Sequence, residues 1–369
     1  MNRLANISRG LSPTALRQLY LACVTSIADY GAILWFNSKT SDAKIAPLQA
    51  LQNKATRRIL GVFKTAPIKP MEVNSALTLL RIRLSHMIRR YSLRILQLNT
   101  KHPVSVKLQQ IRDSEFLYNY ISDSSEMERR IYKNRKQLQI KYISNSINLE
   151  SLDYTSIDTI VSNYYAPWQK VLYYSVEICS ELKEEATKLH ISYLKSLYNQ
   201  LHVSSIYTDA SKLSESENVG ISLVVYKHTI PTIPIVASYS ESRNLGSSII
   251  VYDGELEAVT SAIEYAASVA KRGEYYNVFS DNQAILKRLN SLTDKPGQSH
   301  QIRANIAAKT LTEKGATIVL KWVPGHKDII GNEEADKLAK LATALDPPYL
   351  SLLSFAYINL LISAQKFNQ

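Results

Sequence analysis

VSSIYTDAS (203–211) is the stretch of this sequence that decides the fold. It predicts a β-strand that ends in a turn of small and polar residues. An acidic residue, Asp209, stands at that predicted strand end. The stretch also marks a change of pattern, because helical periodicity dominates the residues before it, whereas strands and helices alternate after it.

The alternation continues for about 140 residues. Further strands are predicted at 219–227, 233–240, 275–281 and 316–326, the last including a loop, and helices at 254–273, 282–292, 299–315 and 332–345. The resulting order, β-β-β-α-β-α-α-β-α, predicts an α/β fold in which helices cover the faces of a mixed sheet.

Four acidic residues hold notable positions in this pattern. Asp209 and Asp281 end predicted strands, where acids are common turn residues. Glu255 opens a predicted helix, where an acid is expected because of the helix dipole. Asp336 lies inside the last predicted helix. Each position therefore has an ordinary structural explanation when it is taken alone.

Taken together, the four acids favour a metal site. Carboxylates that converge on the carboxyl edge of a sheet repel one another unless cations lie among them. Ligand sets made only of oxygen select hard divalent ions, which are Mg²⁺ or Mn²⁺. Two such ions about 4 Å apart can activate a water and neutralise the leaving oxygen of a phosphodiester.

Four blocks carry a resemblance to type 1 ribonuclease H: YTDAS (207–211), GELEA (254–258), FSDNQ (279–283) and WVPGHKDIIGNEEADKLA (322–339). They occur in the family's order, and Asp336 stands ten positions after His326, the His of the GH pair. The resemblance implies a five-stranded mixed sheet flanked by helices over residues 203–344. It also implies hydrolysis of the RNA strand of RNA–DNA hybrids with two Mg²⁺ ions, for which Mn²⁺ can substitute.

The resemblance further implies roles for individual residues. Gly325 and Gly331 would give flexibility to a loop around a histidine that assists proton transfer or product release. The implied catalytic residues are Asp209, Glu255, Asp281, His326 and Asp336, of which the four carboxylates bind metal, and the implied substrate-binding residues are Ser211 and Gln283.

The charge of the chain is concentrated near its start. Residues 1–100 hold 15 Lys and Arg but only three acids, so they carry the whole net charge of +12. Residues 204–344 have a net charge of −1, and the segment 292–300, where some family members carry a basic handle, is nearly neutral. The basic region is therefore expected to bind nucleic acid, although a solvated basic surface is the plain alternative.

The first hundred residues are predicted to be helical, with a start at Ser12-Pro13 and further helices at 46–60 and 79–98. YLACVTSIADYGAILW (20–35) and LQALQNKATRRILGVFKTAP (48–67) resemble the region downstream of the reverse transcriptase palm in non-LTR retrotransposons, particularly fungal ones. No YxDD polymerase motif occurs in the sequence. The resemblance implies the carboxyl-terminal part of such a polyprotein, without polymerase activity, and the missing polymerase portion as a possible partner.

Residues 101–200 are predicted to be a helical connector that ends in an amphipathic helix at 176–200, and 345–369 a tail with an apolar helix that packs on protein. Without a secretory or membrane-spanning pattern, we expect an intracellular protein, cytoplasmic or nuclear, and not a secreted one. Two other functional readings stay open: a non-catalytic remnant that binds nucleic acid, and another nuclease or transposase on the same fold.

Overall fold

The structure is a computed structural model that describes residues 10–37, 40–98, 101–107, 110, 160–161, 164–165, 168, 172–197, 200, 202–214, 216–228, 237–347 and 353–367. The chain divides into two compact units, Met1–Glu150 with Asn359–Gln369 and Ser151–Ile358. In the described parts, no helix has the length and hydropathy needed to cross a membrane. Of the predicted connector over 101–200, residues 111–159 lie outside the described residues.

The first unit is helical, as predicted. The Ser12 hydroxyl caps the first helix by accepting from the Ala15 amide. The helices are α1 (Pro13–Leu19), a π-helical segment (Tyr20–Val24), α2 (Thr25–Ala28), α3 (Ala32–Trp35), α4 (Asp42–Leu60), α5 (Ile68–Ser75) and α6 (Leu80–Leu96).

Three details of these helices differ from the prediction. Apolar spacing continues from Leu16 to Trp35, but the helix is interrupted at Gly31, whose φ of 67° is left-handed. Helix α4 starts at Asp42, ahead of the predicted start, and includes Pro47 within it. Helix α5 has no strong sequence signal and was not predicted.

A small apolar core and a buried ion pair hold these helices together. Leu84 and Ile88 of α6 pack with Phe36 and Ile45. The Arg83 guanidinium donates to both oxygens of the buried Asp29 carboxylate, at 2.7 and 2.9 Å. Because Arg83 is bound in this way, it contributes to the packing of the unit rather than to its basic surface.

The second unit is built on one mixed sheet. Its strands, in the spatial order β1-β6-β5-β2-β3-β4, are β1 (Ser175–Glu177), β6 (Thr317–Trp322), β5 (Tyr275–Ser280), β2 (Val203–Lys212), β3 (Val219–Lys227) and β4 (Tyr239–Asn244). The first four run parallel to one another, and the other two pairs, β2–β3 and β3–β4, are antiparallel. The sheet has six strands: the five predicted within residues 203–344, which are β2 to β6, and one additional strand, β1, that precedes them.

The additional strand, β1, lies at the start of the segment predicted as one helix over 176–200. That segment instead contains β1 and then a shorter helix, α10 (Lys183–Ser196). A three-residue strand is too short to show an alternating pattern, which is why the sequence did not predict it. Strand β4 ends at Asn244, later than predicted, and residues 229–236 lie outside the description.

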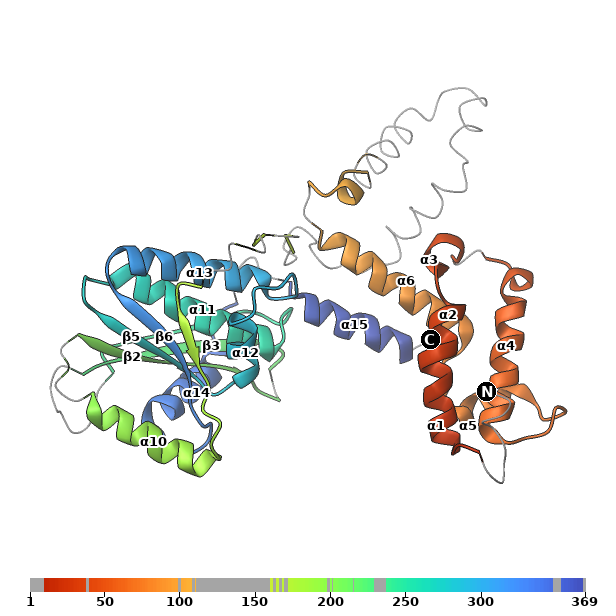
Figure 1. Cartoon of the computed structure of the whole chain (residues 1–369), viewed down its shortest axis with the longest axis horizontal. Coiled ribbons are helices and arrows are strands. Elements are labelled where there is room, and N and C mark those ends of the chain that lie inside the picture. The colour runs from red at the N-terminus through yellow and green to blue at the C-terminus, as the bar shows by residue number, and fades with distance from the viewer. Residues whose placement is uncertain are drawn as a thin grey trace. The chain divides into compact units, whose positions relative to one another are not determined.

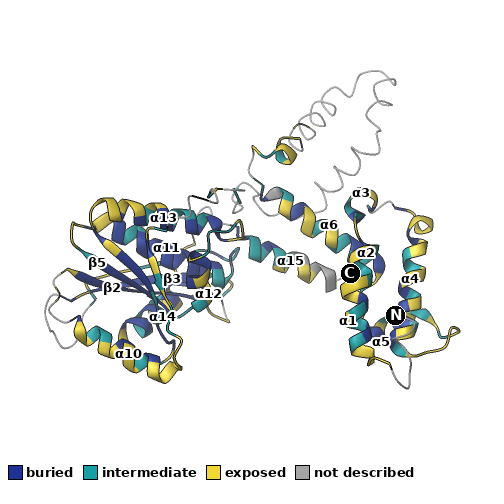
Figure 2. Ribbon diagram, viewed as in Figure 1, coloured by how far each residue is buried: buried dark blue, intermediate teal, exposed yellow. Residues whose placement is uncertain are grey.

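Helices cover both faces of this sheet (Figure 1). On one face lie α11 (Val251–Val269), α12 (Gln283–Leu289) and α13 (Gln298–Glu313); on the other lie α14 (Ile330–Ala342) and α10. Ile206 and Val278 belong to the core beneath α11 and α13, whereas the alternate residues Tyr207 and Phe279 belong to the core beneath α14. This period of two is the one expected of strands buried on both faces, and Figure 2 shows the sheet buried between the exposed outer sides of the helices.

Apart from the strand over 233–240, the elements predicted after residue 203 are present, with ends displaced by a few residues. The tail contains α15 (Phe355–Phe367), a helix with an apolar composition, as predicted. These results confirm the α/β class and the flanking helices. The sheet edge at which β2 and β5 end is where the acidic residues lie.

Candidate active site

Strand pairing brings Asp209 and Asp281 together. Strands β2 and β5 are parallel, with Tyr207 opposite Phe279. Asp209 and Asp281 each lie two residues beyond this pair, and their carboxylate oxygens come within 4.8 Å of each other. Asp281 follows the last residue of β5 directly, as predicted, whereas Asp209 lies within β2 and is paired with Ser222 of β3.

Helix α11 adds a third carboxylate to this pair. Gly254 lies so close to Val219 and Ala210 that a side chain there would clash with both. This contact brings α11 against the sheet and delivers the next residue, Glu255, to the strand ends. Glu255 is the fifth residue of the helix rather than its first, so a capping or dipole role does not explain it.

Asp209, Glu255 and Asp281 form one compact group, called the carboxylate cluster below. One oxygen from each residue lies within 4.8 Å of the other two. Asp209 and Glu255 are buried and Asp281 is half-buried. The Oε2 atom of Glu255 is buried without a hydrogen-bond donor. A buried oxygen of this kind is costly unless a proton or a cation meets it.

The pKa shifts in the carboxylate cluster also indicate that it needs a cation or protons. Burial, followed by the charges of Asp281 and Asp336, raises the pKa of Asp209 to about 8. Burial, followed by the charges of Asp209 and Asp281, raises the pKa of Glu255 well above its usual range. Burial also raises the pKa of Asp281, although the nearby His326 and Lys183 oppose that rise. The cluster therefore holds protons when no cation is present and would release them to one.

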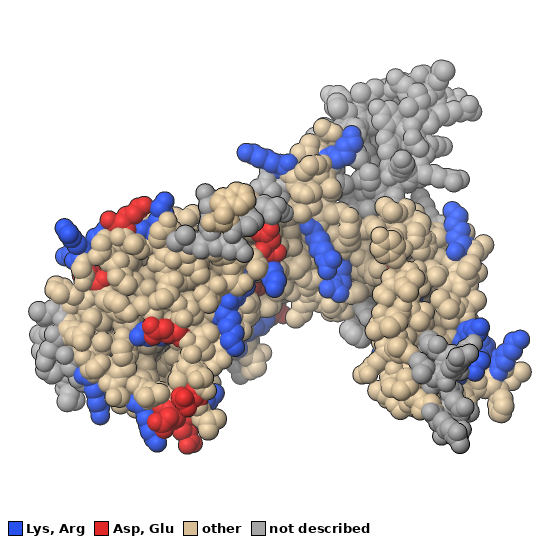
Figure 3. All heavy atoms as spheres, in the orientation of Figure 1, with Lys and Arg blue, Asp and Glu red and all other residues tan. Residues whose placement is uncertain are grey.

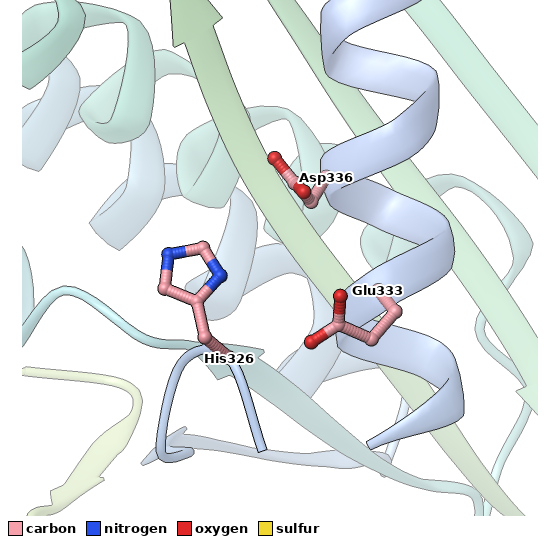
Figure 4. A group of neighbouring side chains, drawn as sticks. All are labelled: His326, Glu333 and Asp336. Carbon is pink, nitrogen blue, oxygen red and sulfur yellow. The ribbon is translucent and has the colours of Figure 1, made fainter. Parts of the chain in front are cut away.

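Asp336 lies beside the cluster, on helix α14. It hydrogen-bonds the Asp209 side chain, and Lys340, one turn later in the helix, donates to its Oδ2 atom at 2.6 Å. Asp336 also belongs to a second group with His326 and Glu333, whose ligand atoms lie within 4.8 Å of one another. Figure 4 shows Glu333 and Asp336 leaving α14 on the side that faces His326.

The loop that carries His326 differs from the prediction. The left-handed positions in it are His326 itself, with φ 57°, and Asp328, with φ 55°, not the two glycines. Gly325 lies against the Asp281 carboxylate and Gly331 against the ring of Tyr207, in the first turn of α14. Both glycines therefore serve close packing rather than flexibility. His326 is exposed.

The structure places the two predicted substrate residues at the edge of the site. Ser211 is half-buried near the end of β2, opposite Gly220. Gln283 is half-buried at the first position of α12, two residues after Asp281. Neither belongs to the two groups of possible metal ligands, so their roles stay predictions.

Sequence reasoning did not identify Glu333 or Lys340. Glu333 precedes Asp336 by three residues and Lys340 follows it by four, so all three lie on one helical face. Acids and lysines at this spacing are ordinary on an exposed helix, and only the nearby His326 loop gives them significance. The signal available in the sequence was the helical spacing around Asp336.

The donor set suits a hard divalent cation. The carboxylate cluster offers only oxygen atoms, and Asp336 adds another beside it. Mg²⁺ and Mn²⁺ prefer such ligands, whereas Zn²⁺ sites are usually built from Cys and His. A cation among these oxygens would also satisfy the unpaired Glu255 Oε2. The residues therefore fit the metal that the sequence predicted.

Comparison with known families identifies this part of the chain. The family model described as RNase H matches residues 202–344. These residues form an RNase H domain. It contains the carboxylate cluster, Asp336 and the His326 loop, whereas β1 and α10 precede it.

Solved structures of RNase H proteins are similar to the same domain. One is RNase H1 from the halophilic archaeon Halobacterium salinarum NRC-1, with 20% identity, a TM-score of 0.29, and coverage of 38% of this chain and 96% of that one. Another is the N-terminal RNase H domain of a Mycobacterium tuberculosis protein, with 16% identity, a TM-score of 0.29 and coverage of 38% and 93%. A third is LC11-RNase H1 in complex with an RNA/DNA hybrid, with 20% identity, a TM-score of 0.30 and coverage of 38% and 96%.

Proposed function

We propose that the RNase H domain hydrolyses the RNA strand of RNA–DNA hybrids as an endonuclease with two divalent metal ions. The observation that supports this most is the carboxylate cluster, in which three acids from β2, α11 and the end of β5 meet within 4.8 Å. Without cations, such an arrangement would only destabilise the fold. We propose Mg²⁺ as the natural ion and Mn²⁺ as a substitute.

In this mechanism, Asp209, Glu255, Asp281 and Asp336 would hold the ions. Bound there, the ions would activate a water and neutralise the leaving oxygen of the phosphodiester. Asp209 lies in the carboxylate cluster with Glu255 and Asp281 and also hydrogen-bonds Asp336, so it lies next to every other proposed metal ligand. The Lys340 ammonium fixes the Asp336 carboxylate from the outer side.

His326 would act on the proton or the product rather than on the metal. It is exposed on the loop before α14, and its ring lies next to Glu333 and Asp336. Histidine is the side chain that most often transfers protons in enzymes. Ser211 and Gln283 would contact the hybrid, Ser211 through its backbone beside the RNA strand and Gln283 in the minor groove, where 2′-hydroxyls distinguish RNA from DNA.

The basic first unit would supply much of the affinity for nucleic acid. A groove at the end of α4 is lined by Lys54, Arg57, Arg58 and Lys64, together with the exposed ring of Phe63. Cations bind phosphates and an exposed aromatic ring can stack on a base, so the groove has the composition of a nucleic-acid site. On the face drawn in Figure 3, acidic side chains lie mainly on the second unit, among basic ones.

We also propose that the chain comes from a non-LTR retrotransposon polyprotein, in which the first unit follows a reverse transcriptase. The support is the sequence of residues 20–35 and 48–67 and the basic helical character of the first unit. The polymerase of such a polyprotein would then be a natural partner.

A cleavage assay tests the proposed activity. Labelled RNA–DNA hybrid, single-stranded RNA, duplex RNA and duplex DNA are incubated with the full chain in Mg²⁺, in Mn²⁺ and in EDTA. We expect internal cleavage of the RNA strand of the hybrid alone, and only with metal. Binding of the hybrid without cleavage would instead support the non-catalytic alternative. Cleavage of duplex DNA would favour another nuclease of this fold.

A further inference from the structure

The residues just before the family match are built into the nuclease unit. Strand β1 pairs in parallel with β6 and extends the sheet by one strand. Next to it, the Tyr174 ring joins the main core, and its hydroxyl donates to the Leu289 carbonyl at 2.8 Å. Helix α10 then lies on the opposite face of the sheet, beside α14 (Figure 1). The chain thus passes around the β6 edge of the sheet before entering the RNase H domain.

Two side chains of helix α10, Tyr193 and His190, hold it along β5. The Tyr193 hydroxyl donates to the Asn277 side chain at 2.9 Å. One turn nearer the start of α10, His190 packs edge-on against Phe279, with 4.8 Å between the ring centroids, and bonds the Tyr207 hydroxyl at 2.9 Å. Tyr193 thus contacts Asn277, whereas His190, earlier in α10, contacts Phe279, later in β5. The helix therefore runs antiparallel to the strand, toward the carboxylate cluster.

This direction determines where the helix begins. From Tyr193 back to Lys183, ten residues of helix cover about 15 Å. From Asn277 to Asp281, four residues of strand cover about 13 Å. The first residue of α10 therefore lies level with the carboxylate cluster. In agreement with this placement, the positive charge of Lys183 acts on the Asp281 carboxylate.

Lys183 has no structural role that explains it. It is exposed, and among the described residues none forms an ion pair with its ammonium group. A lysine at the first position of a helix opposes the helix dipole, whereas the next two residues, Glu184 and Glu185, complement it. The charge thus costs the helix some stability at the place where it faces the cluster.

We propose that Lys183 is a substrate-positioning residue that binds a backbone phosphate of the nucleic acid at the carboxylate cluster. This inference rests on the proposed function and adds to it a residue from outside the family match. Residues 204–344 have a net charge of −1, and the charge of Lys340, a lysine beside the site, is paired with Asp336. A flexible ammonium group is well suited to a phosphate that must approach four acids.

Lys183→Gln tests the proposal, with Lys188→Gln as the matched control. Lys188 lies on the same helix with its side chain 75% exposed, and its one ion pair among the described residues is with Glu185. Hybrid binding is measured by fluorescence anisotropy in EDTA, and hybrid cleavage in Mg²⁺, both over a series of salt concentrations. We expect Lys183→Gln to raise Kd and KM about three- to ten-fold at low salt and to reduce the salt slope by roughly one contact, with kcat changed less than about two-fold. Lys183→Arg should restore both values.

Equal KM, Kd and salt slope in Lys183→Gln and Lys188→Gln would overturn the proposal, provided that the wild-type chain cleaves hybrid. A fall in kcat with unchanged KM would also overturn it, because Lys183 would then act on the carboxylates and not on the substrate. If the wild-type chain neither binds nor cleaves hybrid, the proposed function fails first and the role of Lys183 fails with it.

Discussion

The two units of this chain use charge in opposite ways. The first hundred residues carry a net charge of +12 with only three acids, whereas residues 204–344 carry −1 and bring four of their acids together at one sheet edge. A surface that binds phosphates needs exposed cations, whereas a site that holds divalent metal needs buried anions. The comparison indicates a division of labour, in which the first unit supplies affinity and the RNase H domain supplies chemistry.

Removal of one buried carboxylate is expected to have the largest effect. Asp209→Asn should lower kcat for hybrid cleavage at least about a thousand-fold, because it removes the carboxylate that lies next to every other proposed metal ligand. Kd for hybrid should change little, since affinity resides mainly elsewhere. Glu313→Gln, on the exposed side of α13, is the matched control. Unchanged cleavage by Asp209→Asn would reject the metal assignment.

Neutralisation of the groove in the first unit should instead weaken hybrid binding and leave kcat nearly unchanged. In Lys54→Gln/Arg58→Gln/Lys64→Gln, three exposed cations are lost. We expect hybrid affinity to fall about thirty-fold at low salt and the salt slope to fall by roughly two to three units, with kcat nearly unchanged. Equal slopes for this variant and the wild type would show that the groove does not bind the substrate, and the division of labour would be lost.

A smaller effect is expected at the histidine loop. His326→Ala should lower kcat about ten-fold, below the usual range for general acid–base catalysis, because the histidine assists the reaction without holding the metal. His202→Ala is the control, since His202 is also exposed but lies at the start of β2. If the two variants cleave hybrid equally fast, His326 has no part in turnover.

The smallest effect concerns stability and pH. In EDTA, the folded state keeps a proton on Asp209 up to a pKa of about 8, whereas the unfolded chain loses it near 3.8. Between these values the folded state binds more protons than the unfolded chain, so the free energy of unfolding should fall as pH rises, with a slope of at most about 1.4 kcal/mol per pH unit from this group. Thermal unfolding at pH 5 and pH 8 measures this, and Asp209→Asn should show a smaller fall. Added Mg²⁺ should stabilise the wild type at pH 8; an equal response in Asp209→Asn would contradict the assignment.

Much of the nuclease fold could be predicted from the sequence because its strands and helices have clear periods. Asp209 and Asp281 could be placed together because both stand near the carboxyl ends of parallel strands. Glu255 and Asp336 were assigned through the family blocks, since position in a helix does not by itself indicate a metal ligand. Asp209 lies inside β2 rather than at its end, but its neighbour across the site is still Asp281, as predicted.

The features that the sequence did not indicate depend on packing between distant segments. Strand β1 has three residues and is a strand only because it pairs with β6. The position of Lys183 follows from the direction in which α10 crosses β5, which no local pattern encodes. Gly325 and Gly331 were expected to loosen a loop, yet each is required by a close contact, with Asp281 and Tyr207 respectively. Such contacts become visible only when both partners are in place.

The central claim is that Asp209, Glu255, Asp281 and Asp336 hold divalent metal. Anomalous diffraction from crystals grown with Mn²⁺ tests it most directly. We expect Mn²⁺ peaks about 2 Å from oxygens of these carboxylates, and their loss in Asp209→Asn crystals grown in the same solution. A wild-type crystal with no Mn²⁺ peak at the carboxylate cluster, while hybrid is still cleaved in that buffer, would contradict the claim.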